Sequence, residues 1–475
     1  MSPERRQRNR HMRMKIVHQH YLMFNLDTPR KSVLDEHRKY DFISVLLDDI
    51  PRLLNLFHHD LQEFDEEAGR DSGYSSEQIL RALVVLTLEG MSYRSCVMRL
   101  HTDIFLRNFV RLGVGPVMDF SLLCRVNRAI KPETWERINA ALFQEAKTNH
   151  GVSGDKLPVD STVCETSIHF PTDASLLWDV YRVGARLFGQ WNERVSLRHR
   201  VPYRFHTRKV KALYSFISRL SRSQTPKGEQ RKESLYTTLL ERVAEIHGRV
   251  LCFLESSAAG SSSLPKNATR IVEEFRKMEP TMAKIIDQAG RRVLHGEQVP
   301  AKEKVLSLFE PHTELIVRGK AGKAIEFGHS VTLGQTGEKF ISYYEVLEKR
   351  QPDQEYTDRV LEAHKKQFGE YPRCFAGDKG YWKGREHAEA WREKVEVYSV
   401  PKKGKRTEEE TEAEHSPEFR LMQRFRAGCE GSISVLKRAF GMGKCYWKGF
   451  AAYTVRIATS VFCHNLCALF RLQLS

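Results

Sequence analysis

The sequence predicts an α/β protein whose mixed sheet is interrupted by a helical block and preceded by a helical region. Residues 40–150 carry apolar side chains at helical spacing. Residues 157–168 and 313–400 instead alternate apolar or β-branched residues with polar ones, as strands do. Between them, residues 171–312 return to helical spacing. A chain of 475 residues is long enough for two or three such domains.

The composition favours a globular protein with a polyanionic partner. The chain is 41% hydrophobic and 29% charged, and its formal net charge is +16. Charge of this size favours nucleic acid as a partner. The nine cysteines form no CxxC pair, and Cys463-His464 with Cys467 lacks the second ligand pair that a zinc site needs. This usage is typical of a reducing cytosol, so we expect a cytoplasmic protein.

Neither end of the chain predicts a membrane segment. Residues 1–39 are rich in arginine and read as a basic flexible arm, because the first 15 lack the apolar core of a signal peptide. The most apolar stretch, residues 451–472, is interrupted by Arg456, His464 and Asn465. It therefore predicts a buried helix and no membrane span.

The helical region at 40–150 is a candidate DNA-binding domain. Ser75 and Gln78 form a capping box, Gly90 breaks the helical pattern, and Ser92 can cap a second helix. This helix–Gly–helix arrangement resembles a helix-turn-helix, although a plain helical scaffold needs the same turn. Pro132 suits the first turn of a further helix.

The block at 171–312 reads as a helical insertion that carries most of the positive charge. We expect its helices at 174–188, 208–220, 233–254 and 268–286. Residues 181–233 hold 14 Lys and Arg against three Glu. Such a run is either a solvated face or a DNA-backbone surface, and the scarcity of acids favours DNA. The candidate phosphate contacts are Arg182, Arg186, Arg194, Arg198, Arg200, Arg204, Arg208, Lys209 and Lys211.

The order of the remaining elements narrows the fold. Strand patterns are found at 314–318, 325–332, 340–346, 372–377 and 395–400. Helices are expected at 356–368, at 384–394 and from 418, and an exposed loop at 401–417. Without the insertion, and with two strands counted before the helix at 356, the order is β-β-β-α-β-α-β-α. This is the order of a ribonuclease-H-like domain, formed here by residues 157–170 and 313–475.

Three acids occupy positions from which they can converge in that fold. Asp160 follows the apolar run 157–159, Asp378 follows the run 374–376, and Glu430 lies in a helical tract. The carboxyl ends of neighbouring strands and an overlying helix can bring acids together. Three carboxylates are the smallest economical set for two Mg²⁺ ions, which would activate an attacking oxygen and stabilise the leaving one.

Two cations share the helix face of the third acid. Arg426 precedes Glu430 by four residues, and Lys437 follows it by seven. Cations beside a metal-binding carboxylate would hold phosphates of a substrate. The alternative is an ordinary surface helix with an i,i+4 ion pair.

These motifs resemble those of insertion-sequence DDE transposases. Arg426-x3-Glu430-x6-Lys437 is similar to their helix signature, with Gln423 where the full form has tyrosine. Asp378-Lys379-Gly380-Tyr381 resembles the second-Asp motif, and residues 157–162 resemble the first-Asp strand. Residues 171–179 are similar to the continuation in the ISNCY-type group, and residues 79–90 and 119–130 resemble the N-terminal transposase domain.

The resemblance implies a cut at the ends of a mobile element followed by strand transfer. It implies that Asp160, Asp378 and Glu430 hold two Mg²⁺ or Mn²⁺ ions and that Arg426 and Lys437 contact phosphates. The partners would be double-stranded DNA, namely the terminal inverted repeats and the target, and a second copy of the chain on paired ends. A catalytically inactive DNA-binding regulator and a metal-dependent nuclease without strand transfer remain alternatives.

Several other residues have competing interpretations. Glu165 lies five residues from Asp160 on one strand and so points to the opposite face, as a structural residue or a substrate contact. His169 could assist proton transfer or simply lie at the surface. Trp178, Trp382 and Trp447 could stack on a flipped base or pack in the core, and Trp382 is the best DNA-binding candidate of the three.

Overall fold

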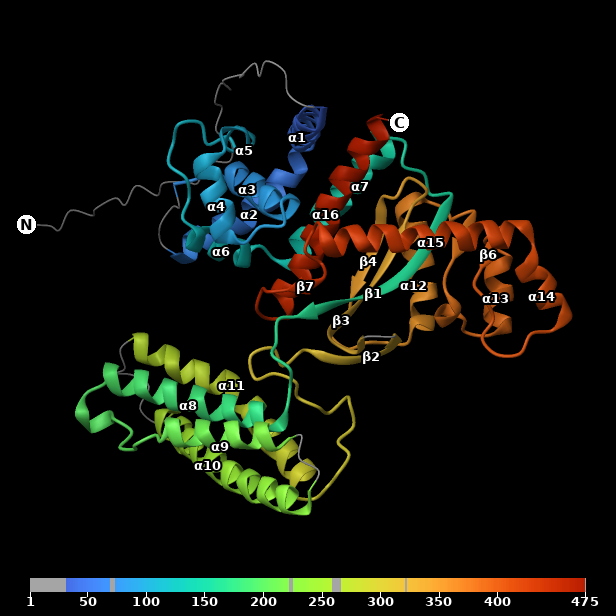
Figure 1. The fold of residues 1–475 in the computed structure, drawn as a ribbon. Coiled ribbons are helices and arrows are strands. Elements are labelled where there is room, and N and C mark those ends of the chain that lie inside the picture. Colours follow the sequence, from blue (N-terminus) through green and yellow to red (C-terminus); the bar gives the residue numbers. More distant parts are fainter. Residues whose placement is uncertain (1–30, 69–72, 222–224, 259–265, 321–322, 475) are drawn as a thin grey trace, which may run out of the picture. The chain divides into compact units, whose positions relative to one another are not determined.

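The computed structural model describes residues 31–68, 73–221, 225–258, 266–320 and 323–474 (Figure 1). The chain divides into two compact units. The first contains the residues up to Glu165 together with those from His329 onward, and the second is Thr166–Gly328. The chain therefore leaves the first unit and returns to it.

The N-terminal part of the first unit is helical, as predicted. Ser75 and Gln78 form the expected capping box, Ser92 caps the next helix, and Pro132 lies in the first turn of α7. The predicted arm at 1–39 overlaps the first helix, which begins at Lys31, while residues 1–30 lie outside the described part. The helices are α1 (Lys31–Asp49), α2 (Pro51–Ala68), α3 (Ser76–Leu88), α4 (Tyr93–Thr102), α5 (Ile104–Phe109), α6 (Phe120–Ala129) and α7 (Pro132–Asn149).

These helices share one hydrophobic core with the end of the chain. Trp135 on α7 is fully buried, and its ring lies 6.2 Å from Phe57 and 5.7 Å from Phe462 on α16 (Phe450–Leu474). The middle of α16 is buried, which agrees with the prediction for residues 451–472. Among the described residues, no helix is both long and apolar enough to cross a membrane.

The two helices of the predicted helix-turn-helix differ in how far they are buried. Nearly every residue of α3 is buried, so α3 is an internal packing helix. By contrast, α4 exposes Arg94, Met98 and Arg99 on one side. If this pair reads DNA, α4 is the helix with side chains available to do so.

The first unit also holds the mixed sheet. Along the main path of the sheet the strand order is β2-β3-β1-β5-β6, with β2 at Glu314–Lys320, while β4 pairs antiparallel with β3 and β7 pairs with β1. The run β1-β5-β6 is parallel. The strands are β1 (Lys156–Thr166), β3 (Lys323–Gln335), β4 (Ile341–Val346), β5 (Cys374–Ala376), β6 (Val397–Ser399) and β7 (Lys444–Cys445).

The remaining helices follow the predicted order with one correction. The expected loop at 401–417 contains α14 (Glu408–His415), because Thr407 and Glu410 form a capping box that starts a helix. The chain has three strands between the insertion and α12, and the first of them, β2 (Glu314–Lys320), belongs to the second unit. The other elements are η3 (Asp353–Glu355), α12 (Tyr356–Phe368), η4 (Lys379–Tyr381), α13 (Arg385–Arg392) and α15 (Pro417–Arg438).

The second unit is a helical bundle with its own core. Phe188, Phe253 and Phe275 pack against one another with ring centroids 4.8–5.5 Å apart. The antiparallel pairing of β2 with β3 completes the unit. Its helices are α8 (Asp173–Arg194), η1 (Leu197–His199), α9 (Thr207–Leu220), α10 (Pro226–Ala258) and α11 (Lys266–Val293), close to the four predicted ranges.

Candidate active site and basic surfaces

Parallel pairing of β1 with β5 places two of the predicted acids side by side. Pro158 lies opposite Ala376 in the register. Two residues after them come Asp160, still within β1, and Asp378, which follows the end of β5. Asp160 lies within β1, not at its end as expected, but it follows the part of β1 that pairs with β5. Both carboxylates therefore emerge at the carboxyl end of β5, where parallel sheets commonly place their sites.

The helix α15 supplies the third acid and a cation. Arg426 forms an ion pair with Asp160, with 3.5 Å between Nη1 and Oδ2. Glu430 lies one turn further along and is exposed. Burial raises the pKa of Asp160, and the charges of Asp378 and Glu430 raise it further, while the backbone N–H of Ser161 and the Arg426 guanidinium lower it. Asp378 and Glu430 thus both lie near enough to Asp160 for their charges to act on its carboxylate.

Gln423 fastens α15 to the sheet at this place. Its Nε2 donates to the carbonyl oxygen of Ser399 at 2.7 Å and to that of Gly377 at 3.1 Å. Its Oε1 accepts from Nε of Arg426 at 3.2 Å. One amide therefore joins the ends of β5 and β6 to the arginine that contacts Asp160.

The segment after β5 holds Asp378 in a tight turn. Oδ1 of Asp378 accepts from the backbone N–H of Gly380 at 2.7 Å, and a Cβ at Gly380 would lie 2.8 Å from that oxygen. The buried hydroxyl of Tyr381 lies 2.7 Å from Oγ of Ser161, the residue after Asp160. A glycine at position 380 and the tyrosine at 381 thus link the two aspartates structurally.

The donor set fits hard divalent cations. Carboxylate oxygens are the ligands that Mg²⁺ and Mn²⁺ prefer, and cations would relieve the repulsion among these acids. The three carboxylates are not as tightly grouped as His59, Asp60 and Glu63, whose ligand atoms all lie within 4.8 Å of one another. However, Asp60 accepts from the backbone N–H of Lys131, and Glu63 pairs with the Lys131 ammonium group, so that cluster has a structural explanation.

The other residues that the sequence singled out lie on different elements and have partners of different kinds. Lys437 is half-buried on α15. Burial raises the pKa of the Cys164 thiol to about 12, and the charge of Lys437 acts against this rise. Trp382 is half-buried against the core around β5 and β6. His169 pairs with Asp179 in the second unit at 2.6 Å. Trp178 stacks on Tyr214, and Trp447 stacks on Tyr93.

The predicted DNA-binding cations fall into two groups. Arg182 pairs with Asp179 at 2.7 Å, and Arg186 pairs with Glu274 at 3.6 Å, so both are partly neutralised within the unit. The side chain of Arg198 lies outside the described residues. The remaining cations are exposed and have no ion pair among the described residues: Arg194, Arg200, Arg204, Arg208, Lys209 and Lys211.

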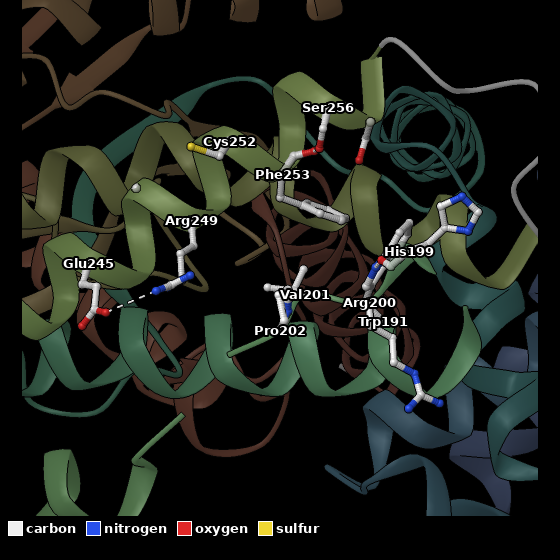
Figure 2. A pocket seen from close by; sticks show the side chains of 12 residues that line it. Trp191, His199, Arg200, Val201, Pro202, Glu245, Arg249, Cys252, Phe253 and Ser256 are labelled. Carbon is white, nitrogen blue, oxygen red and sulfur yellow. Dashed lines mark hydrogen bonds and ion pairs between the residues drawn. The ribbon is translucent and has the colours of Figure 1, made fainter. Parts of the chain in front are cut away.

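A pocket of about 640 Å³ opens in the second unit between α8, the segment that includes η1, and α10 (Figure 2). Trp191 and Phe253 form its apolar lining. Arg249, its polar wall, is paired with Glu245 at 3.4 Å and lies 3.7 Å from the Tyr203 ring centroid. Arg249 thus already has a carboxylate and an aromatic partner, while the second arginine of the lining, Arg200, is exposed.

The sequence pattern indicates no role for Gln423, which stands where the related helix signature has tyrosine. Its side chain proves to be the link between α15 and the sheet. A glutamine at helical spacing from Arg426 was the only signal. The hydrogen-bonding partners at Gly377 and Ser399 come from distant strands, so the pattern alone could not reveal them.

Comparison with known proteins identifies one domain. Residues 30–129, which hold α1 to α6, match the transposase domain family (DUF772). No curated protein and no solved structure matches the chain. Residues 30–129 therefore form a transposase domain, which supports placing this chain among the insertion-sequence transposases.

Proposed function

We propose that this protein is a DDE transposase with a ribonuclease-H-like catalytic domain, in which Asp160, Asp378 and Glu430 hold two Mg²⁺ or Mn²⁺ ions. The observation that carries the proposal is that Asp160 on β1 and Asp378 after β5 lie side by side in the parallel register, while Arg426 of α15, the helix that also holds Glu430, forms an ion pair with Asp160. The element order within the first unit, β1, β3, β4, α12, β5, α13, β6 and α15, and the transposase domain at 30–129 support it.

Each residue then has a definite task. The bound ions would supply activation of an attacking oxygen and stabilisation of the leaving oxygen of a phosphodiester. Asp160 and Asp378, fixed by adjacent strands, would set the position of the ligand oxygens, and Glu430 would close the site from α15. Arg426 and Lys437 would contact phosphates. The first attack would free a 3′-hydroxyl, and that hydroxyl would attack target DNA in the second step.

The proposed partners follow from the charge and the chemistry. With a formal charge of +16, the chain suits double-stranded DNA, both the element's terminal repeats and the target. A homodimer on paired ends would hold two cleavage events together. The helix α4, with Arg94, Met98 and Arg99 exposed, would be the part of the N-terminal domain that reads DNA.

Isosteric loss of any one acid tests the catalytic assignment. Asp160→Asn, Asp378→Asn and Glu430→Gln keep the shape of each side chain but remove its charge. We expect each to slow Mg²⁺-dependent cleavage of a plasmid carrying both flanks of this coding sequence by at least about 100-fold, because even second-shell losses at metal sites cost 10- to 100-fold. Affinity for a duplex from those flanks should hardly change.

Glu418→Gln provides the matched control. It removes an exposed acid from the same helix α15, and the helix rise places it roughly 18 Å from Glu430. It should cleave like the parent protein. Parental cleavage by any of the three variants would remove that residue from the proposed set. Cleavage without joining to target DNA would indicate a nuclease, and DNA binding without Mg²⁺-dependent cleavage would indicate a regulator.

A further inference from the structure

We propose that the exposed face of α9 is a docking surface for the phosphate backbone of double-stranded DNA. This inference rests on the proposed function only in taking DNA as the substrate. It assigns a separate binding surface, formed by Arg208, Lys211 and Arg219 with Phe216 beside them, to the second unit.

The helix α9 is divided into a buried and a charged face. Val210 and Ile217 are almost fully buried in the core of the unit. Arg208, Lys211 and Arg219 are exposed and follow at intervals of three and eight residues, so they lie on the opposite side of the helix. From Arg208 to Arg219 the helix rises about 16 Å, which matches roughly five base pairs along one strand.

The charge on this face has no counterpart within the unit. Among the residues that the structure describes, Arg208, Lys211 and Arg219 take part in no ion pair, whereas Arg182 and Arg186 on α8 do. The sequence of α9 contains no Asp or Glu at all. The neighbouring helices α10 and α11 mix both signs, for example Glu241, Glu245 and Glu274. Only an external anion can therefore compensate the α9 charge, and phosphate is the anion that DNA presents in a regular row.

The shape of the face suits a phosphate row. Its small residues Ala212 and Ser215 form the floor of a shallow hollow of about 370 Å³, which the three cations and Phe216 surround. Phe216 is 47% exposed, and the Arg219 guanidinium lies 5.8 Å from its ring centroid. The ring therefore restricts the arginine. The pocket near Arg249 differs from this face, because Arg249, one of the two arginines that line it, is already paired with Glu245.

A charge-matched pair of triple variants tests the surface. The test variant is Arg208→Gln/Lys211→Gln/Arg219→Gln on α9. The control is Arg270→Gln/Arg276→Gln/Lys277→Gln on α11, which also removes two arginines and one lysine from exposed positions that form no ion pair within the described part of the chain. Binding of the full chain to a short duplex of arbitrary sequence is measured by fluorescence anisotropy over a range of salt concentrations.

We expect the α9 variant to bind about 10-fold or more weakly at physiological salt. Its plot of log K against log salt should be shallower by about 2 to 3, since each lost phosphate contact reduces the slope by about 0.9. The α11 control should keep the parental slope. The exchange variant Arg208→Lys/Lys211→Arg/Arg219→Lys should bind like the parent, which would show that charge and not folding is responsible.

Equal losses in the α9 and α11 variants would overturn the proposal, because they would show a diffuse field and no defined surface. A parental slope in the α9 variant would overturn it as well and would leave the face to an acidic protein partner. The result is separate from the catalytic test. If the carboxylate variants cleave normally while the α9 variant binds weakly, the catalytic proposal fails and the surface stands, and the reverse pattern rejects the surface alone.

Discussion

Gln423 illustrates how one neutral side chain can organise a charged site. Its amide bonds the carbonyl oxygens after β5 and at the end of β6, and it accepts from Arg426. Arg426 in turn contacts Asp160. Because a guanidinium on a helix has many rotamers, this anchor favours the one that faces the carboxylates.

Loss of the Gln423 amide should therefore impair cleavage more than DNA binding. For Gln423→Ala we expect a 10- to 100-fold lower rate of single-turnover cleavage at saturating DNA, the usual cost of losing a group that orients a site residue. The dissociation constant for the duplex should stay within about 3-fold of the parental value. The two measurements separate the cleavage rate from the affinity for DNA, so a positioning role is distinguishable from substrate binding.

The neighbouring Arg424→Ala is the control, because Arg424 is exposed on the same helix. It removes a cation without touching the sheet, so its cleavage rate should remain parental. A Gln423→Ala protein that cleaves normally, yet melts at a lower temperature, would show that the amide only fastens α15. Gln423→Glu should not rescue cleavage, since a carboxylate cannot donate to the two carbonyl oxygens.

At this scale the sequence predicts which residues approach one another better than how they are held. Asp160, Asp378 and Arg426 could be singled out from local patterns. The proximity of the two aspartates follows from the β1–β5 register, and Arg426 reaches Asp160 from α15. The role of Gln423 depends on carbonyl groups 24 and 46 residues away in the chain. Spacing on one helix carries no information about such partners.

Individual elements were predictable where a local rule starts or ends them. The capping box at Ser75 and the proline at the start of α7 set helix boundaries correctly. The prediction of a loop throughout 401–417 was wrong for Glu408–His415, because Thr407 and Glu410 form a capping box that starts a helix in the acidic block. Strand alternation located β2 to β4, but it could not show that β2 belongs to the second unit.

The beginning of α8 contains a pair whose strength should depend on pH. His169 precedes the helix, and its Nε2 lies 2.6 Å from a carboxylate oxygen of Asp179 on α8. The hydrogen bond with Asp179 raises the pKa of His169 above its ordinary value of 6.5. This geometry favours a structural interpretation of His169 over proton transfer in the proposed reaction.

Because the pKa of His169 is raised in the folded state, the direction in which the free energy of unfolding depends on pH is fixed. The stability that the pair contributes is fully present below pH about 6.5 and is lost as the pH rises through the higher folded-state pKa. His169→Asn should therefore lower the free energy of unfolding of the second unit by up to about 1 kcal/mol at pH 5.5–6, since His169 is 44% exposed. The difference should fade in alkaline solution.

Denaturant titrations at several pH values measure this difference. His199→Asn serves as the control, because His199 is an exposed histidine of the same unit that faces Ser196 and no carboxylate in the described contacts. Its unfolding free energy should differ from that of the parent by an amount that does not change with pH. A His169→Asn effect that grows toward alkaline pH would reject the ion-pair account.

For the whole molecule, the main feature is that the large core of the first unit is separate from the core of the second, while two smaller clusters around β5 and β6 also belong to the first unit. One core joins the N-terminal helices to α16 and to parts of the sheet, and the other lies among α8, α9, α10 and α11. The sequence indicated an insertion, yet it could not show that residues 40–150 pack against residues 450–474. That packing depends on contacts between segments more than 300 residues apart, which no local pattern encodes.

Two cores should give two thermal transitions. Trp135 is a large, fully buried side chain of the first unit, and Phe275 is one of those in the second. We expect Trp135→Ala to destabilise the first unit by about 3–5 kcal/mol and Phe275→Ala to destabilise the second by a similar amount. At a few degrees per kcal/mol for units of this size, each variant should lower one melting temperature by roughly 10 °C.

Differential scanning calorimetry of the full chain distinguishes the outcomes, with the α9 triple variant as a surface control that leaves both transitions in place. The two alanine variants must affect different transitions, because Trp135 contacts Phe57 and Phe462, whereas Phe275 contacts Phe188 and Phe253. If both shift a single shared transition by the same amount, the units unfold as one cooperative body. The second unit would then depend on the first for its stability and would not be a bundle that folds on its own core.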